Sequence, residues 1–525
     1  MPLAESEPRA AEVYGREWVP VVTAAESTAL DREAREEGGI PERVLMEDAG
    51  RSAALVLDRL FPRGRVVGVV GSGHNGGDAL VLLRNLKAWG REVACVPASS
   101  RLPDLALLHG HDVPIVDPER AAEAFAGADV LVDGILGTGA VGAPRAGSAA
   151  LIQEMNRSGR PILALDVPSG VDPTTGQVPG EAVAATVTVT FGWPKLGLLF
   201  HPGRSRCGRL VAVEIGFPPL EAGQAPTAAL ITPEWAARRL PQRAPDAHKG
   251  SAGCLLVVAG SFGMGGAAGI VGRTAVRAGA GLVYLASAPA NREILQVLVP
   301  DAVFVDREDD SALQAAAARA DAVVIGPGLG LDEGAQRALD RALALTSGQP
   351  VLLDADALTL LARQPEELKR LAETRPAVIT PHPGEFSRLT GVPIPEVRAA
   401  PVQRARDFAE ETGCIVLLKG APSVVAAAGE PVLIGTTGSS DLATAGMGDA
   451  LAGVIGAFLA AGVEARTAAA LGLFYSARAA DLAGRGRSLS TRDVAECLDR
   501  AFACPGARAS SLALPFVTFD QPARW

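Results

Sequence analysis

The sequence predicts an α/β protein, and three observations point to that class. Apolar residues make up 48% of the 525-residue chain but aromatic residues only 4%, so the core must consist mainly of Ala, Val and Leu. Glycine (59) and proline (38) are abundant, as expected where many tight turns join short elements. Short runs of β-branched residues alternate with Ala-rich stretches of helical spacing along most of the chain. A chain of this length exceeds one ordinary core and should divide into two or three domains.

Charge and cysteine usage exclude several classes of function. A net charge of −10 gives no basic footprint for nucleic acid. Residues 1–9 are acidic and lack an apolar signal core, and nowhere do 18 apolar residues run uninterrupted. We therefore expect a cytoplasmic protein with small-molecule partners and no nucleic-acid or membrane partner. Six scattered cysteines without a C-x-x-C pair indicate reduced thiols, which fits that compartment: Cys95, Cys207, Cys254, Cys414, Cys497 and Cys504.

The first 225 residues predict a domain that begins with helices and continues as a βαβ unit. A buried strand runs into a glycine-rich turn, Gly71–Asp78, which a helix follows, and this is the first half of a Rossmann-like unit. A ligand is expected at that turn. The expected elements are helices at 25–34 and 41–60, a strand at 65–70, the turn at 71–78, a helix at 79–89 and strands at 93–96, 128–133, 161–166, 186–191 and 210–215.

Three carboxylates lie in or at the ends of βα turns of this domain. Asp78 ends the first glycine-rich turn, Asp133 precedes Gly134–Gly139, and Asp166 precedes the turn 167–172. Such turns share one edge of an open parallel sheet, so the three carboxylates are expected to face one crevice.

A stretch rich in Pro, Ala and Gly, residues 217–247, breaks the alternation, and we place a domain boundary near 225. The second domain, 226–510, is again expected to be α/β, and residues 511–525 carry no periodic pattern and are expected to form a C-terminal tail. The expected strands of the second domain are at 254–259, 282–286, 322–325, 351–354, 377–380 and 415–419.

The richest motif of the second domain is Gly446-Met447-Gly448-Asp449, where a turn of small residues opens an apolar helix. Free backbone N–H groups and the positive end of a helix dipole would meet there beside one carboxylate. Two further turns, Lys419–Ser423 and Thr436–Ser439, are expected to reach the same anion. The combination predicts phosphoryl transfer to a hydroxyl that Asp449 deprotonates. Taken alone, a G-x-G-D stretch is more often an ordinary turn.

The motifs of both halves, in order over residues 20–500, resemble a known pair of enzymes. Gly71–Asp78, Asp133–Gly139, Leu165–Asp172 and Val189–Leu199 with His201–Gly203 resemble NAD(P)H-hydrate epimerases, and the second domain resembles ADP- or ATP-dependent NAD(P)H-hydrate dehydratases. The resemblance implies a Rossmann-like three-layer domain followed by a ribokinase-like α/β domain. The whole chain resembles the fused bifunctional repair enzymes, and we expect a homo-oligomer. The runs that match in the second domain are His248–Gly250, Gly266–Ala268, Arg277–Gly281, Gly326–Gly330, Asp354–Leu358, Thr380–Glu385, Leu418–Gly420 and Ala443–Asp449.

For the first domain, the resemblance implies a site that binds R- and S-hydrates of NADH and NADPH (NADHX and NADPHX) and interconverts them. It implies Asp166 as the catalytic contact and a potassium ion held by Asn75, Asp133 and Ser169, whose oxygens are the donors an alkali ion prefers. The alternative is that Asn75 and Ser169 only satisfy the backbone of their turns. The implied substrate-binding residues are His74, Asn75, Gly76, Gly77, Asp78, Gly137, Thr138, Gly139, Ala140, Val141, Gly142, Ala143 and Asp166.

For the second domain, the resemblance implies that Ala267, Gly328 and His382 line the hydrated nicotinamide, whose C6 hydroxyl meets Asp449. ADP or ATP, with Mg²⁺, would phosphorylate that hydroxyl, and elimination of phosphate would restore the dihydronicotinamide. The residues implied to bind the nucleotide are Lys419, Gly420, Ala421, Pro422, Ser423 and Gly448.

Several residues of the second domain keep open alternatives. His382, between two prolines, is by itself more typical of a rigid turn than of a functional residue. Asp354 and Asp356 are compatible with a metal pair or with a carboxylate that caps the next helix. Glu385 is a candidate to orient magnesium-bound water.

The sequence also departs from the patterns it resembles. His74 stands where epimerases usually have Asn, and Ala79 where they often have Gly. Met447 is larger than the residue at this place in many ribokinase-like enzymes, and the loop 263–266 lacks an aromatic residue often found there. Two rival functions therefore remain: a vitamin-precursor kinase fused to a Rossmann module, and a dehydratase whose first domain is a non-catalytic scaffold.

Overall fold

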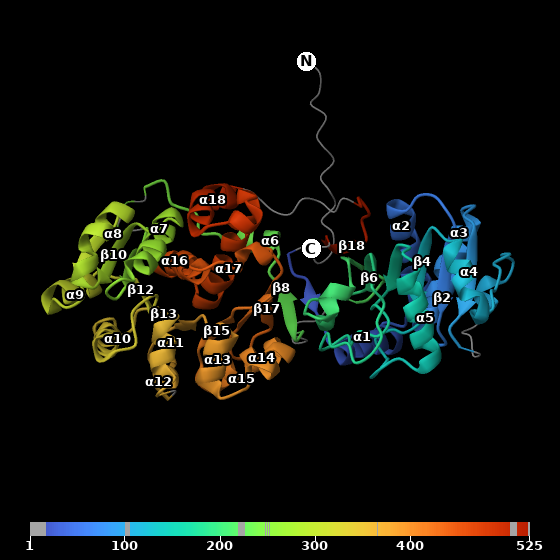
Figure 1. Ribbon diagram of the computed structural model, residues 1–525, viewed down its shortest axis with the longest axis horizontal. Helices are drawn as coiled ribbons and strands as arrows, with labels where there is room; N and C mark the ends of the chain where they lie inside the picture. Colours follow the sequence, from blue (N-terminus) through green and yellow to red (C-terminus); the bar gives the residue numbers. More distant parts are fainter. Residues whose placement is uncertain are drawn as a thin grey trace, which may run out of the picture. The chain divides into compact units, whose positions relative to one another are not determined.

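The structure is a computed structural model in which the chain forms two compact units (Figure 1). Unit 1 consists of residues 1–229 and 508–525, and unit 2 of residues 230–507. No helix in the described part of the chain is long and apolar enough to cross a bilayer. The described residues are 17–99, 105–218, 226–246, 248, 250, 252–364, 366–503 and 512–522.

Unit 1 is a three-layer sandwich around a sheet with the strand order β18-β7-β6-β5-β4-β2-β3. All neighbouring strands are parallel except β18, which is antiparallel to β7. One core cluster packs α2 and α3 against one face, and a second packs α4 and α5 against the other. The strands are β2 (Val66–Val70), β3 (Val93–Pro97), β4 (Val130–Gly134), β5 (Ile162–Leu165), β6 (Val187–Phe191), β7 (Arg209–Val213) and β18 (Val517–Gln521), and the helices are α1 (Ala24–Glu36), α2 (Glu42–Leu60), α3 (His74–Ala88), α4 (Ala121–Ala126) and α5 (Ala146–Arg157).

Helix α3 corrects the prediction of a glycine-rich turn followed by a helix from residue 79. The helix already begins at His74. A Cβ atom on Gly76 would lie 2.1 Å from the carbonyl oxygen of Gly71, and one on Gly77 would lie 2.6 Å from Cε of Met46. These glycines therefore allow the first turn of α3 to pack closely on the end of β2 and on α2, which local sequence rules interpret as a loop.

The expected C-terminal tail at 511–525 is also wrong, because strand β18 occupies residues 517–521 and pairs with β7. The pairing is irregular between Val517 and Phe519, so the strand lacks the strict alternation by which it would be recognised. The expected boundary at residue 225 lies outside the described residues; the two units divide between 229 and 230.

The sheet of unit 2 runs in the order β17-β16-β15-β14-β13-β12-β9-β10-β11. Strands β9 to β15 form a parallel array, while β16 and β17 add an antiparallel hairpin that the sequence did not predict, as it did not predict β11. Helices α7, α16 and α17 lie on one side of this sheet and α10, α12 and α15 on the other (Figure 1). The strands are β9 (Cys254–Val258), β10 (Leu282–Ser287), β11 (Val303–Asp306), β12 (Ala322–Ile325), β13 (Val351–Leu353), β14 (Ala377–Ile379), β15 (Ile415–Leu418), β16 (Ser423–Ala426) and β17 (Val432–Gly435).

Two short strands complete the described sheet structure: β1 (Pro20–Val21) pairs antiparallel with β8 (Ala228–Leu230).

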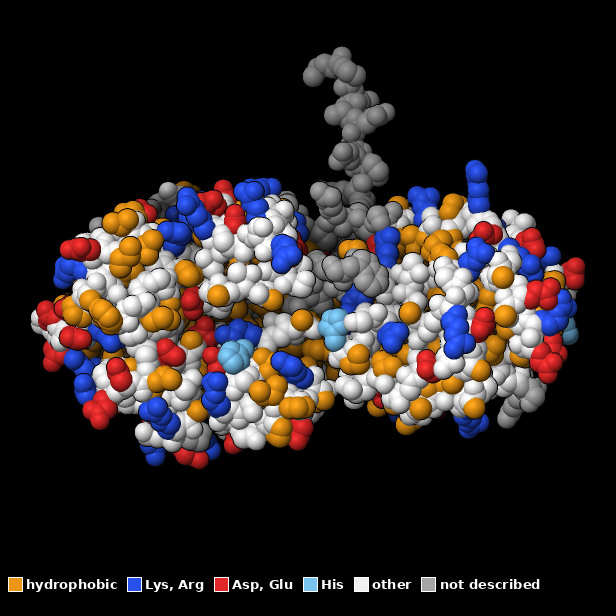
Figure 2. Space-filling model, viewed as in Figure 1, with side chains coloured by type: hydrophobic (Ala, Val, Ile, Leu, Met, Phe, Trp, Pro, Cys, Tyr) orange, Lys and Arg blue, Asp and Glu red, His pale blue; other side chains and the backbone are white. Residues whose placement is uncertain are grey.

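Basic and acidic side chains are interspersed over the face drawn in Figure 2. The helices of unit 2 are α6 (Pro233–Arg239), α7 (Gly265–Arg277), α8 (Arg292–Leu298), α9 (Asp310–Ala317), α10 (Glu333–Leu345), α11 (Asp356–Leu361), α12 (Glu366–Thr374), α13 (Pro383–Thr390), α14 (Ile394–Ala399), α15 (Pro401–Thr412), α16 (Met447–Ala460), α17 (Ala465–Ala483) and α18 (Thr491–Ala503).

Candidate active sites in the two units

In unit 1, Asp133 is a fully buried carboxylate at the end of β4. It accepts hydrogen bonds from the Ser169 hydroxyl (2.6 Å), the Ser169 N–H (2.8 Å) and the Ile135 N–H (3.2 Å). Burial raises the pKa of Asp133 to about 6, although these hydrogen bonds act in the opposite direction. No described Lys, Arg or His forms an ion pair with it.

Asn75, in the first turn of α3, presents an oxygen with no partner. Its Nδ2 donates to the carbonyl oxygens of Leu136 (2.8 Å) and Leu165 (3.1 Å), while its Oδ1 is buried without a hydrogen bond. A buried acceptor left unsatisfied is costly unless something binds it. Of the three residues expected to hold a potassium ion, Asn75 is thus the one with an unsatisfied oxygen, while the Ser169 hydroxyl donates to Asp133 and accepts from the Leu136 N–H (2.9 Å). The described residues contain no cluster of three His, Cys, Asp or Glu side chains suited to a metal ion.

Asp166 follows β5 and forms a buried ion pair that the sequence analysis missed. Its Oδ1 lies 2.6 Å from Nζ of Lys195, which also donates to the carbonyl oxygen of Phe191 (2.7 Å). The Phe191 N–H (3.2 Å) and the Thr190 hydroxyl (3.3 Å) donate to the same carboxylate oxygen. The only available signal was a lysine within an apolar run, residues 189–199.

The backbone of Asp166 is strained, since its φ of 60° lies in the left-handed region that few non-glycine residues adopt. Asp78 lies close enough to interact with it: burial, and next the negative charge of Asp166, raise the pKa of Asp78 well above its usual value. Asp78 and Asp166 therefore lie near each other, as expected from the sequence. The third carboxylate, Asp133, is instead hydrogen-bonded to Ser169.

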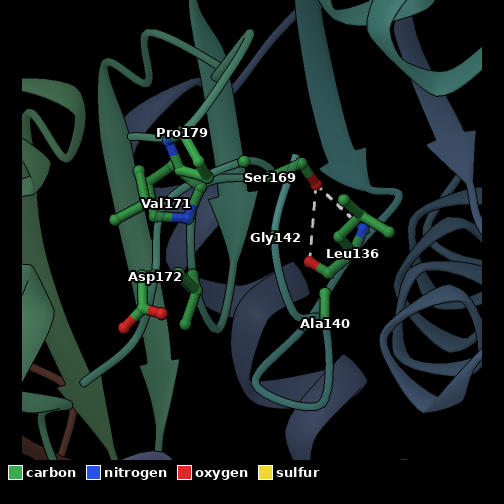
Figure 3. Close-up of a pocket in the computed structure, with 11 residues that line it drawn as sticks. Leu136, Ala140, Gly142, Ser169, Val171, Asp172 and Pro179 are labelled. Atoms are coloured by element: carbon green, nitrogen blue, oxygen red, sulfur yellow. Dashed lines mark hydrogen bonds between the residues drawn. The ribbon is translucent and has the colours of Figure 1, made fainter. Parts of the chain in front are cut away.

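A shallow hollow that opens to solvent lies beside Ser169 (Figure 3). Its wall includes Gly137, Ala140 and Gly142 from the loop predicted to bind substrate, together with Ser169. Thr138, Gly139, Val141 and Ala143 belong to the same loop but do not line the hollow, and Val141 is 93% exposed. The Ser169 hydroxyl meets the backbone of Leu136 at the edge of this hollow (Figure 3).

His74, the residue that departs from the epimerase pattern, is exposed at the start of α3. Its Nε2 lies 3.0 Å from Oε1 of Glu42, which begins α2. The structure therefore gives His74 a surface partner.

In unit 2, Lys419 lies at the end of β15 among carboxylates. Its Nζ is 2.8 Å from Oδ1 of Asp354 and 3.8 Å from Oε2 of Glu385. Burial lowers the pKa of Lys419, but the charges of Asp354, Glu385 and Asp449 raise it by more, so the net shift is upward. The lysine predicted to bind a nucleotide is thus held in place by Asp354.

Asp449 occupies the first turn of α16, a helix that begins after Gly446 in a left-handed conformation (φ 83°). Burial, and next the charge of Asp354, raise the pKa of Asp449 to about 7, while Lys419 lowers it. A Cβ atom on Gly448 would lie 3.4 Å from Nζ of Lys419. The start of α16, Lys419 and Asp449 therefore come together, as the sequence predicted.

The residues predicted to contact nicotinamide fall into two groups. A Cβ atom on Gly328 would lie 3.0 Å from Cβ of Ala267, so these two adjoin each other. His382 instead caps α13: its Nδ1 accepts from the N–H groups of Gly384 (2.9 Å) and Glu385 (3.2 Å), and Glu385 accepts from the His382 N–H (2.8 Å). This capping box supports the structural alternative for His382, whose side chain nonetheless remains half exposed.

Asp354 and Asp356 have separate partners. Asp354 pairs with Lys419, whereas Asp356 accepts from the Gly330 N–H (2.9 Å) and so holds the loop 326–330. In the turn Lys419–Ser423, the Ser423 hydroxyl accepts from the Gly420 N–H (3.0 Å). The third turn, Thr436–Ser439, was expected to reach the same anion, but its described hydrogen bonds go to other groups. The Gly438 N–H donates to Asp481 (3.4 Å), and Ser439 caps the short helix at 440–442.

Comparisons with known proteins match both units. Residues 42–197 match the family model "YjeF-related protein N-terminus", and residues 255–499 match the model of NAD(P)H-hydrate dehydratase. The bifunctional NAD(P)H-hydrate repair enzyme Nnr of Moorella thermoacetica is 36% identical over 507 residues, covering 91% of this chain and 95% of that protein. The enzyme of the same name from Escherichia coli is 36% identical over 465 residues, covering 86% and 87%.

Among solved structures, the ADP/ATP-dependent NAD(P)H-hydrate dehydratase of Bacillus subtilis, co-crystallised with ATP and Mg²⁺, is 29% identical with a TM-score of 0.46 and covers 54% of this chain and 99% of that one. The full-length relatives carry the assignment, because their similarity spans both units in the same order. The chain therefore belongs to the family of bifunctional NAD(P)H-hydrate repair enzymes and has the α/β fold class expected from its sequence.

Proposed function

We propose that unit 1 interconverts the R and S epimers of NADHX and NADPHX, and that unit 2 dehydrates the S epimer to NADH or NADPH at the expense of ADP or ATP. The observation that carries the proposal is the setting of Asp449, a partly buried carboxylate with a pKa of about 7 at the start of α16 beside Lys419. A base with that pKa near an anion-binding helix start suits proton abstraction coupled to phosphoryl transfer.

In the dehydration, Asp449 takes the proton of the C6 hydroxyl as the hydroxyl oxygen bonds to the terminal phosphorus of the nucleotide. The bond from that phosphorus to its bridging oxygen breaks at the same time and releases AMP from ADP or ADP from ATP. The N–H groups of Gly446–Gly448 stabilise charge on the transferring phosphoryl group, and Lys419 binds the nucleotide phosphates. The C6–O bond then breaks with loss of phosphate, and loss of the C5 proton forms the C5–C6 double bond. Mg²⁺ bound with the nucleotide would neutralise phosphate charge.

The other predicted contacts keep their roles in this proposal. Ala267 and Gly328 adjoin one another and would lie against the nicotinamide ring, and His382 would present its exposed edge to it. Gly420–Ser423 and Gly448 would hold the nucleotide, with Asp354 fixing Lys419.

In the epimerisation, Asp166 relays a proton to the C6 hydroxyl, which leaves as water while the N1 electron pair forms the N1–C6 double bond. Water then adds to the other face of C6, and Asp166 takes back the proton that this addition releases. Lys195 and the Phe191 N–H hold the Asp166 carboxylate in one orientation. A potassium ion held by Asn75, Asp133 and Ser169 would supply fixed positive charge next to the predicted substrate loop. The support for that ion is the unpartnered Asn75 Oδ1 and the uncompensated charge of Asp133.

The decisive experiment is to incubate the protein with a mixture of both NADH hydrates and ADP or ATP, and to follow absorbance at 340 nm. Complete recovery requires both activities. Recovery that stops with one epimer left would support the scaffold alternative for unit 1. Phosphate transfer to a vitamin precursor without any recovery would support the kinase alternative.

We also propose a cytoplasmic location and a homo-oligomeric state. The location is supported by free thiols at Cys95, Cys207, Cys254, Cys414 and Cys497. Light scattering of the purified protein would test the oligomeric state, and a monomer at micromolar concentration would contradict it.

A further inference from the structure

Strand β18, near the C-terminal end of the chain, forms an edge of the unit 1 sheet. Val517 lies opposite Val213 of β7, and Asp520 lies opposite Val211. The Glu214 N–H donates to the carbonyl oxygen of Phe516 (2.9 Å). Although β18 follows unit 2 in the sequence, it completes the sheet that carries the proposed epimerisation site.

Side chains hold this strand in register. Arg209 donates from Nε (2.8 Å) and Nη2 (2.6 Å) to the two oxygens of Asp520, a bidentate pair of fixed geometry. Leu512 and Val517 are buried in the core cluster that also contains Phe191 and Val213. The pairing is therefore specified by both charge and packing.

Only β7 separates β18 from the strand that supports Asp166 and Lys195. Val213 lies opposite Phe191 at the end of β6, and its carbonyl oxygen accepts from the Gly192 N–H (2.8 Å). The Phe191 N–H donates to Asp166, and the Phe191 carbonyl oxygen accepts from Lys195. Val517 of β18 therefore pairs with Val213 of β7, which pairs with Phe191 of β6. The backbone of Phe191 in turn hydrogen-bonds to Asp166 and Lys195.

We propose that β18 is a positioning element of the epimerisation site: by pairing with β7 it fixes the end of β6 and so the orientation of Asp166 and Lys195. This inference rests on the function proposed for unit 1. The segments predicted to bind substrate are the first turn of α3 (74–78) and the loop 137–143. They follow β2 and β4, which lie farther along the sheet from β18. Loss of β18 should therefore lower kcat for epimerisation with little change in KM.

The first test is Asp520→Ala, with Glu123→Ala as the matched control, because Glu123 forms an exposed ion pair with Arg120 on the same unit. A positional error of about 1 Å at reacting groups costs up to about 100-fold, so a partial release should lower epimerisation kcat about tenfold. KM and the dehydration rate of the S epimer should be unchanged. Amide hydrogen exchange at Phe191 and Gly192 should become faster, and Asp520→Glu should restore most of the activity.

The second test is a chain ending at residue 511, for which we expect about a 100-fold loss of epimerisation kcat. A peptide of residues 512–525 added in excess should restore activity. Unchanged epimerisation kcat in both variants would overturn the inference, as would an equal loss of both activities. Failure of the unaltered chain to epimerise would count against the proposed function instead, and exchange at Phe191 and Gly192 would still report whether β18 orders β6.

Discussion

Asp449 is the residue that we propose as the base of the dehydration in unit 2. Replacing it with Asn removes the base but keeps the size of the side chain, so we expect the dehydration kcat to fall by about 10²–10⁴-fold, the usual contribution of a general base. The measurement is recovery of 340 nm absorbance from the S epimer. Asp499→Asn, an exposed residue of α18, is the control.

The same substitution, Asp449→Asn, should lower activity but raise the stability of the folded protein above neutral pH. Burial raises the pKa of Asp449 to about 7 in the folded protein, so ionisation opposes folding once the pH exceeds the lower pKa of the unfolded chain. The cost grows up to about pH 7 and is constant above it. At pH 8, Asp449→Asn should therefore unfold at a higher temperature than the unaltered chain, and at pH 3 the two should coincide. A variant that lost both activity and stability would contradict a catalytic role.

The pH profile of dehydration offers an independent test through Asp354. A base must be deprotonated, so the rate should rise with pH through about 7 and level off above. The charge of Asp354 raises the pKa of Asp449, and Asp354 also engages Lys419, whose charge lowers it. Asp354→Asn should thus move the rising limb to lower pH. Asp356→Asn should shift the pH profile less, because the charge of Asp356 raises the pKa of Asp449 by less than that of Asp354. An unchanged pH profile in Asp354→Asn would contradict the proposed interaction between Asp354 and Asp449.

Substitution of Asn75 tests the potassium site that we propose in unit 1. Asn75→Leu removes the unpartnered Oδ1, so we expect epimer exchange, followed by NMR, to be slower and no longer to depend on the potassium concentration. In the unaltered chain, potassium activation should weaken as the pH falls below about 6, because protonation of Asp133 competes with the cation. Potassium dependence retained in Asn75→Leu would exclude this residue as a ligand.

At the scale of elements, the close approach of α3 to the end of β2 depends on Gly76. Gly76→Ala would place Cβ 2.1 Å from the Gly71 carbonyl oxygen, so we expect a loss of about 1–3 kcal/mol in unit 1 and slower epimerisation. The control is Gly147→Ala in α5, where Cβ meets nothing within 4 Å and helix propensity should add about 0.5–1 kcal/mol. Hydrogen exchange of the β2 and β4 amides in urea measures both, and equal stability of the two variants would contradict the packing argument.

The same helix shows how far sequence reasoning extends. Apolar runs and glycine-rich turns predicted β2, β4 and β5, and therefore the placement of Asp133 and Asp166 at one edge of a sheet. They could not predict that α3 starts at His74. Glycine occurs both in turns and where a helix packs closely on another element, and the sequence alone does not distinguish the two. The packing partner of Gly77, Met46, lies on another helix.

Non-local partners explain the other gaps. Lys195 is separated from Asp166 by 29 residues, and only the fold shows that the two meet. The hairpin of β16 and β17 follows a turn whose residues also suit nucleotide binding, so its strands were not recognised. Capping likewise gives His382 a structural role that its sequence neighbours only partly indicate.

At the scale of the whole molecule, unit 1 is discontinuous in sequence. Unit 2 lies between residues 229 and 508, and the chain then returns to unit 1 as β18. Family resemblance predicted two consecutive domains because its motifs end near residue 500. The hydrogen bonds that build each proposed site come from that site's own unit, which makes the two activities separable by substitution.

That separation leads to a complementation test between two copies of the chain. Asp166→Asn should retain dehydration, so recovery from a mixture of hydrates should stop with the R epimer left. Asp449→Asn should retain epimerisation but form no dihydronicotinamide. Because the S epimer released by one chain can diffuse to another, an equimolar mixture of the two variants should give complete recovery. A mixture no better than Asp166→Asn alone, with both variants folded by circular dichroism, would mean that the hydrate passes between the two activities only within one chain.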